Sequence, residues 1–396
     1  MSKNKPHIKA PLWTRPFVLL VVGHFLQALG WSSMLLLPLY VKHLGATETQ
    51  LGMVMAASSV GGLLLRPVVG WSLDNVGRRR TLVAGTLVLF AGMFLVGFVN
   101  VIGWQLFSAR VLIGIGGGTL FTGYFTYVSD FIPESRRTEG LALFGISGLL
   151  PVGFNAAIHR LDIPIADLNQ LYPYVSMLIL ASLAALLYVP ETRGRMPNRR
   201  LASRPKAFAS LLSKPLMSTW LATIVFSTMV AVFMAFITVT GRLRDIENTP
   251  DLWAFYAGGA VGVRLFGGRL PDLIGTHNMV VPALAAYTGA FVLAAGAQDY
   301  WTICLAGTAA GLGHGYCFPV LTSQVVSRID FRLKGIGLAT FTAIWEVTSL
   351  TLTPLFGLFA DHYGLGSMFA LGAVAATIGC AFWLIVEQVS SRPAKN

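Results

Sequence analysis

Long apolar stretches alternate with short polar segments along the whole chain of 396 residues. An α-helix needs about 20 apolar residues to cross a bilayer, and most of these stretches reach that length. Lipid favours helices because they satisfy their own backbone hydrogen bonds. The pattern therefore predicts an all-α membrane protein with twelve transmembrane helices, over residues 16–40, 50–73, 81–100, 102–128, 138–160, 171–189, 216–240, 251–271, 278–297, 301–326, 335–359 and 365–387.

The polar segment between the sixth and seventh stretches is the longest of the chain, and it is strongly basic. It divides the helices into two groups of six. We expect a tail over residues 1–15, a six-helix bundle over 16–189, a basic linker over 190–215, a second six-helix bundle over 216–387 and a tail over 388–396.

The second half of the chain repeats positions of the first half. Arg66, Asp74 and Gly77 recur 198 residues later as Arg264, Asp272 and Gly275. Glycines of the fourth helix recur in the tenth at an offset of 197, as does the tripeptide that begins at Gly140. A pattern G-x-x-x-D-x-x-G also ends at Gly77, Gly275 and Gly364, the third time at the other membrane face. These repeats predict two pseudo-symmetric bundles with the substrate bound between them.

The composition supports a membrane location. Hydrophobic residues make up 55% of the chain and charged residues only 12%, about half the charged share of a soluble protein. The net charge of +12 sits in short loops, so nucleic acid is not an expected partner. Of the 29 Lys and Arg residues, 22 fall on the side of the tails and the linker and four on the other side. This bias predicts that both termini and the linker are cytoplasmic.

Motifs for other kinds of chemistry are missing from the sequence. The three cysteines lie in apolar stretches without a C-x-x-C pair, so neither a metal site nor a disulfide framework is indicated. The glycine runs lack the GK[ST] ending of a phosphate loop, and neither HExxH nor GxSxG occurs. We therefore expect no cofactor, no catalytic residues and no enzymatic activity.

Three segments resemble the major facilitator superfamily. Gly70-Trp-Ser-Leu-Asp74-Asn-Val-Gly77-Arg78-Arg79-Arg80 is similar to that family's loop between helices two and three, and Arg110-Val-Leu-Ile-Gly114-Ile-Gly116 to its fourth-helix motif in proton-coupled members. Gly145-Ile-Ser-Gly148-Leu-Leu-Pro151-Val-Gly153 resembles in part the fifth-helix motif of drug–proton antiporters. Shorter matches point to bacterial efflux permeases that include opine-metallophore (staphylopine-like) exporters. The resemblance implies a monomer in the bacterial inner membrane that moves a small molecule by alternating access.

The loop at Asp74 is the candidate cytoplasmic gate. In the family that it resembles, an acid beside basic residues at this position locks the cytoplasmic side, and the alternative is a set of plain orientation charges. We expect Asp130, at the end of the fourth helix, to pair with Arg78. The gate residues expected are Asp74, Gly77, Arg78, Asp130 and, in the second half, Asp272.

Three ionisable residues inside predicted helices are candidates for proton coupling: Glu346, Arg110 and His314. A carboxylate in the middle of the eleventh helix is costly unless it is paired or protonated, which makes Glu346 the first candidate. Arg110 either takes part in coupling or anion binding, or ties two helices together. Arg66 and Arg264 precede their aspartates by two helical turns, and we expect them to extend toward the gate loops.

Polar and aromatic residues near the middle of the bundles are candidates for the substrate cavity. Each has an alternative as packed core or as a hydrogen-bond partner of a neighbouring helix. The residues expected are His24, Gln27, Trp31, Tyr124, Asn155, Phe318 and Trp345.

The sequence is compatible with three functions. The first is a proton-driven exporter of a drug-like compound or metallophore. The second is a symporter or facilitator for uptake of a nutrient or siderophore, which the same fold would serve, because a fold does not decide direction. The third, a polytopic membrane enzyme or sensor, would need a catalytic constellation or an output domain, and the sequence shows neither.

Overall fold

A computed structural model describes residues 11–192, 211–329 and 334–391. Residues 1–10 and 392–396 of the predicted tails and residues 193–210 of the predicted linker lie outside these ranges. The first bundle contains α1 (Arg15–Ser32), α2 (Leu37–His43), α3 (Glu48–Leu64), α4 (Arg66–Asn75), α5 (Arg78–Val96), α6 (Trp104–Ser129), α7 (Arg137–Leu149), α8 (Phe154–His159) and α9 (Leu171–Leu187). The second contains α11 (Lys214–Leu243), α12 (Leu252–Phe266), α13 (Leu270–Ile274), α14 (Thr276–Gly296), α15 (Tyr300–Arg328) and α16 (Lys334–Ser391).

The described elements group into twelve crossings, as the hydrophobic pattern predicts, when each broken pair counts as one and α16 as two. By length and apolarity alone, eight of the described helices, or nine with the bent pair α3–α4, could cross a membrane. Four crossings consist of two helical pieces: α1 with α2, α3 with α4, α7 with α8, and α12 with α13. A proline stands at or beside each break, at Pro38, Pro67, Pro151 and Pro271. Proline lacks the N–H that continues a helix, so the sequence sets where these crossings bend. The bend between α3 and α4 is 44°.

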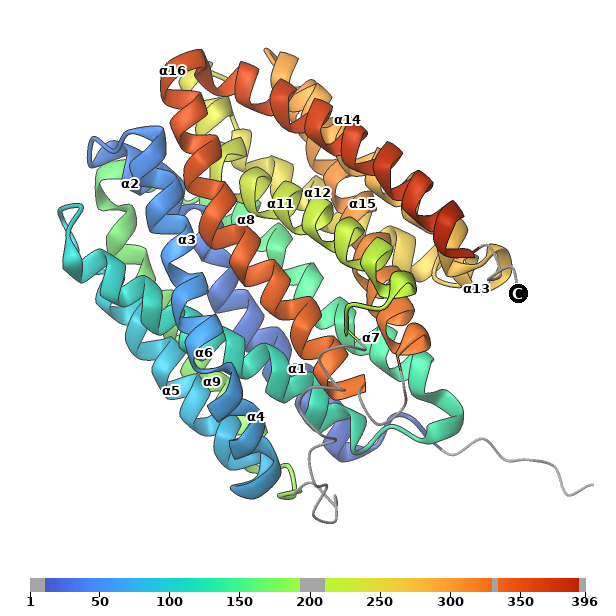
Figure 1. Ribbon diagram of the computed structural model, residues 1–396. Coiled ribbons are helices and arrows are strands. Elements are labelled where there is room, and N and C mark those ends of the chain that lie inside the picture. The colour runs from blue at the N-terminus through green and yellow to red at the C-terminus, as the bar shows by residue number, and fades with distance from the viewer. Residues whose placement is uncertain (1–10, 193–210, 330–333, 392–396) are drawn as a thin grey trace, which may run out of the picture.

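Two further crossings lie within α16, which turns back on itself at Gly364, where φ is +82°. Gly77 and Gly275 also have positive φ, at +127° and +89°. The three copies of the G-x-x-x-D-x-x-G pattern therefore end in the same kind of turn, which an L-residue with a side chain adopts only with strain. In Figure 1 the turn of α16 lies at the top, away from α4 and α13. We call the end of the molecule with α4 and α13 the linker end and the opposite end the distal end.

The two bundles meet along two seams. In Figure 1 the first half of α16, drawn in orange-red, runs beside α3 of the blue-to-green bundle. On the other side of the molecule α12 packs against α7, α8 and the short 3-10 helix Leu150–Gly153 between them. These two seams are related by the internal repeat, because α3–α4 corresponds to α12–α13 and α7–α8 to the first half of α16.

Within each bundle, glycines allow close backbone contact at equivalent positions. Gly114 on α6 lies against the backbone of Ser58 on α3, and Gly311 on α15 lies against the backbone of Tyr256 on α12. A methyl group at either glycine would overlap a carbonyl oxygen. The structure thus confirms that the glycine runs serve helix packing, as small residues do in membranes.

Candidate functional site

The first seam holds an ion pair between the two bundles. Arg66 begins α4 directly after the bend, and its Nη2 lies 3.3 Å from Oε1 of Glu346 in the first half of α16. Arg66 Nη1 also donates a hydrogen bond to the hydroxyl of Thr342, one helical turn earlier on α16. Gly62 leaves the space that the Glu346 carboxylate occupies. Glu346 is therefore paired with a cation across the bundle interface.

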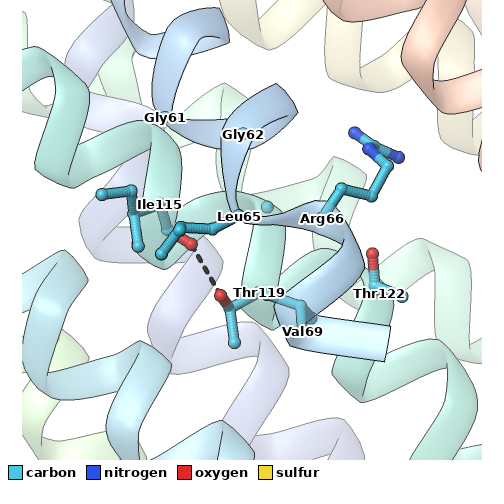
Figure 2. A pocket seen from close by; sticks show the side chains of 9 residues that line it. Gly61, Gly62, Leu65, Arg66, Val69, Ile115, Thr119 and Thr122 are labelled. Atoms are coloured by element: carbon cyan, nitrogen blue, oxygen red, sulfur yellow. Dashed lines mark hydrogen bonds between the residues drawn. The ribbon is translucent and has the colours of Figure 1, made fainter. Parts of the chain in front are cut away.

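A small cavity lies beside this pair, inside the first bundle. Figure 2 shows it between α3–α4 and α6, with the Arg66 side chain extending away from Ile115 and Thr119. The cavity measures about 10 Å³ and is lined by glycines, Leu65, Val69 and threonines, so it has room for about one water molecule. The Arg66 charge is thus directed at the seam, and the expectation that Arg66 extends to the gate loop is wrong. Glu346 contacts Arg66 directly, whereas Asp74 of the gate loop lies two helical turns further along the chain. In this low-dielectric setting the nearer carboxylate is the stronger partner.

The second seam holds Arg264, the repeat partner of Arg66, in a different setting. Its Nη1 lies against Gly145 on α7, where a methyl group would overlap it. Its Nε is buried and has no hydrogen-bond partner among the described residues. Tyr256 and His314 lie close enough to interact with it electrostatically. Arg264 therefore also turns to the seam, contrary to the expectation that it extends to its own gate loop.

His314, a proton-coupling candidate, lies together with the cavity candidates Phe318 and Trp345. His314 Nδ1 is 2.5 Å from the hydroxyl of Tyr256, and its ring lies 6.1 Å from Trp345 and 6.5 Å from Phe318 between centroids. Phe318 also meets Phe121 of the first bundle edge to face, at 5.9 Å. These side chains form a mixed polar and aromatic surface of the second bundle that reaches the first.

The candidates on α1 have different surroundings. His24 is buried; its Nδ1 lies 2.7 Å from Ser147 Oγ and its ring stacks on Phe144. Gln27 is buried one turn later. Trp31 keeps 37% of its surface exposed and faces Gly117 on α6. The structure thus leaves Trp31 accessible, whereas His24 and Gln27 lie inside the first bundle.

Three other candidates lie in the packed interior of the first bundle. Arg110 donates hydrogen bonds to the carbonyls of Val54 and Met55, at 3.0 and 2.7 Å. This is the helix–helix tie that the sequence left open as an alternative. Tyr124 and Asn155 are fully buried, and the Asn155 amide donates to backbone carbonyls. Arg110 and Asn155 thus direct their N–H groups to backbone carbonyls within the first bundle.

The gate residues of the first bundle lie together at the linker end. Arg78 contacts Asp74 Oδ1 at 2.8 Å and Asp130 Oδ2 at 3.4 Å, the pairing with Asp130 that the sequence predicts. Gly77 supplies the turn between the two helices. The Asp272 side chain lies outside the described part of the structure.

Sequence reasoning missed two residues of this gate cluster. Glu191 accepts hydrogen bonds from the backbone N–H groups of Arg79 and Arg80, at 2.9 and 3.2 Å. Thr192 donates to Asp130 at 2.6 Å. A carboxylate at a helix start satisfies N–H groups that have no partner within the helix. The sequence signal is an acid directly after the sixth helix, at the start of the predicted linker.

Polar contacts also join the bundles at the distal end. Asp361 on α16 accepts hydrogen bonds from the backbone N–H groups of Glu48 and Thr49, at 2.6 and 2.9 Å, and so caps α3 of the other bundle. Arg160, after α8, pairs with Asp251 at 2.8 Å. The described contacts between the bundles thus gather at the distal end and at the middle of the molecule.

Comparisons with known proteins agree with this architecture. A sequence model of the family described as Major Facilitator Superfamily matches residues 20–263. An uncharacterized MFS-type transporter of Salmonella typhimurium is 26% identical, over 88% of this chain and 90% of the relative. The multidrug resistance protein MdtG of Proteus mirabilis is 23% identical over 96% of each chain. The crystal structure of a mutant of the nucleoside transporter NupG superposes with a TM-score of 0.79 at 12% identity, covering 94% of this chain and 99% of that one.

Proposed function

Because this chain belongs to the Major Facilitator Superfamily, we propose that this secondary transporter exports a small organic molecule in exchange for protons. The observation that supports proton coupling is the ion pair between Arg66 and Glu346, which joins the two bundles at mid-membrane. An ionisable residue inside a membrane protein is costly, so its presence points to a role in transport.

The pair gives a direct link between protonation and bundle movement. With Glu346 ionised, separating α4 from α16 would leave a partly buried carboxylate and a partly buried guanidinium without partners, which is costly. A proton on Glu346 removes that charge, so the seam opens at lower cost. The hydrogen bond from Arg66 to Thr342 crosses the same seam and breaks when α4 and α16 separate. Proton uptake on one side and release on the other would thereby drive the exchange of states.

The charge bias and the bacterial relatives support an orientation in the inner membrane with the linker end cytoplasmic. In that orientation the contacts of Asp361 and Arg160 close the periplasmic side. The gate cluster around Arg78 has partners from its own bundle alone among the described residues. We therefore assign the described state as inward-facing, with the gate cluster ready to contact the second bundle when that side closes.

Export is supported by the relatives and by the fifth-helix motif. Proteins named for multidrug resistance match this chain along almost its full length. The motif glycines have a packing role at the second seam: Gly145 receives Arg264, and Gly153 contacts Ala254 and Ala257 of α12. A motif associated with antiporters thus shapes one of the two surfaces that must move against each other.

Proteoliposomes with an internal pH dye test the proposal. A proton gradient is imposed, and cationic drugs, opine-type metallophores and sugars are added in turn. We expect one class to produce substrate-dependent proton flux, and Glu346→Gln to reduce that flux at least about tenfold, because an amide cannot carry the proton. Glu247→Gln is the control, since Glu247 is an exposed carboxylate in the distal loop.

The direction of the two fluxes decides between mechanisms. Opposite movement of substrate and protons supports the antiport proposal. Movement in the same direction would indicate a symporter for uptake. Substrate movement with no proton flux, unchanged in Glu346→Gln, would refute the role of the Arg66–Glu346 pair.

A further inference from the structure

Each seam contains an arginine at the equivalent position of the repeat, and the two seams differ in the residues that face this arginine. Arg66 Nη1 meets Thr342, and Arg264 Nη1 meets Gly145. Thr342 and Gly145 are equivalent, because they are separated by the 197 residues that relate these two helices. At the same offset Glu346 corresponds to Leu149. The second seam therefore preserves the cation of the first and lacks both its hydroxyl partner and its acid.

Packing elsewhere on the same helices supports this equivalence. Gly140 lies against Ile132, and its repeat partner Gly337 lies against Ile329, again 197 residues apart. The two arginines thus approach their partner helices at corresponding heights. Leu149 is buried, so an apolar side chain occupies the position at which the first seam holds a carboxylate.

Arg264 is consequently a half-buried cation, with a buried Nε and no counter-ion among the described residues. Its neighbours Tyr256 and His314 are not acidic residues, and they are hydrogen-bonded to each other. A guanidinium has five N–H donors, and an unpaired charge in such a setting is unfavourable unless something neutralises it. Arginine also matches a carboxylate with two parallel hydrogen bonds. The seam between the bundles is where transporters of this architecture bind their substrates.

We propose that Arg264 binds a carboxylate of the transported substrate, so that the substrate is a small organic acid or a zwitterion. Tyr256 and His314 provide additional hydrogen-bonding groups beside that carboxylate. This inference rests on the proposed transport function and names its substrate class. In this arrangement Glu346 neutralises the arginine of the first seam, and the substrate neutralises the arginine of the second.

Labelling of arginines with phenylglyoxal tests the site without requiring transport. The full chain is purified in detergent and a buffer free of chloride and carboxylates, and the labelling rate of each arginine is measured by mass spectrometry. We expect Arg264 to react faster than Arg66, which is already paired. Saturating benzoate should slow the labelling of Arg264 about tenfold, the effect of one charge-assisted hydrogen bond, and the neutral analogue benzamide should not.

Two substitutions of Leu149 provide an internal counter-ion and its control. Leu149→Glu should slow the labelling of Arg264 without benzoate, whereas Leu149→Gln, of nearly the same size and uncharged, should not. If these variants do not fold, the benzoate and benzamide measurements on the unmodified chain still decide the question. Arg66 labelling should be unchanged by benzoate.

Equal effects of benzoate and benzamide on Arg264 would overturn the proposal. Protection by chloride alone, with no further effect of benzoate, would assign the site to an inorganic anion and overturn the substrate assignment. Either result leaves the proton flux through Glu346 untouched, and a loss of proton coupling in liposomes leaves this binding result untouched. The two proposals can therefore fail separately.

Discussion

The seam of α4 with α16 and the seam of α12 with α7 have a common origin in the repeat and different chemistry. The first places Arg66 against Thr342 and Glu346. The second places Arg264 against Gly145, with Leu149 where the acid would stand. Duplication preserved the packing and the arginine, and the acid is present on one side only.

The two seams thus show how equivalent positions of a symmetric fold can have different functions. A cation with a built-in acid can be switched by a proton. A cation without one needs an external anion, and a substrate can supply it. The comparison makes predictions for substitutions at matched positions of the two halves.

The largest expected effect comes from removing each arginine in turn. Arg66→Met leaves the partly buried Glu346 carboxylate unpaired and should destabilise the protein by about 2–3 kcal/mol. Arg264→Met removes an unpaired cation and should be neutral or stabilising. Thermal unfolding in detergent at neutral pH measures both, and the penalty of Arg66→Met should shrink as the pH falls, because a protonated Glu346 needs no cation. Equal destabilisation by both variants would contradict the proposal that only Arg66 has an internal counter-ion.

Packing is the feature that the two halves share, so matched glycine substitutions should behave alike. Gly114→Ala and Gly311→Ala each place a methyl group on a backbone carbonyl of the neighbouring helix, which should cost about 1–3 kcal/mol. Gly258→Ala is the control, since nothing lies within 4 Å of its added carbon. A thermal shift in one half alone would show that the halves are not packed equivalently.

A substitution at the distal contacts should have a smaller effect, which is a shift in the population between the states with the distal end closed and open. Asp361→Asn keeps the size of the side chain and loses the charge that strengthens its hydrogen bonds to Glu48 and Thr49. The cost of about 1–2 kcal/mol should move the population toward separation of the bundles at this end. Spin labels at Thr47→Cys and His362→Cys, with the three native cysteines replaced, report the distance, which should lengthen. An unchanged distance distribution would argue against a closing role for Asp361.

The smallest effect is expected at the gate loop. Asp74 contacts Arg78, yet 60% of its side chain is exposed, and exposed ion pairs contribute about 1 kcal/mol or less. Asp74→Asn should therefore leave thermal stability within a degree or two of the unmodified chain. A large loss would mean that Asp74 has a buried partner in another state.

The sequence predicted the helices well because their length and apolarity are local properties. The repeat also predicted the glycine contacts, since equivalent residues pack alike. It did not predict that Arg66 pairs with Glu346, because their 280-residue separation is bridged by the packing of two bundles. Tyr124 and Asn155 were assigned to the cavity because a helix pattern does not reveal which neighbour covers a given face. Glu191 was missed because its partners are backbone N–H groups, which no side-chain motif records.

The central claim is that the two seams divide the work between a proton and an organic acid. The most direct measurement follows both in the same proteoliposomes: proton flux with an internal dye, and the preference for an acid over its amide. We expect Glu346→Gln to lose proton flux and to retain the acid preference. We expect Leu149→Glu to lose the acid preference and Leu149→Gln to retain it. The proposal would be contradicted if Glu346→Gln and Leu149→Glu each lost both the proton flux and the acid preference. It would also be contradicted if neither variant lost either property.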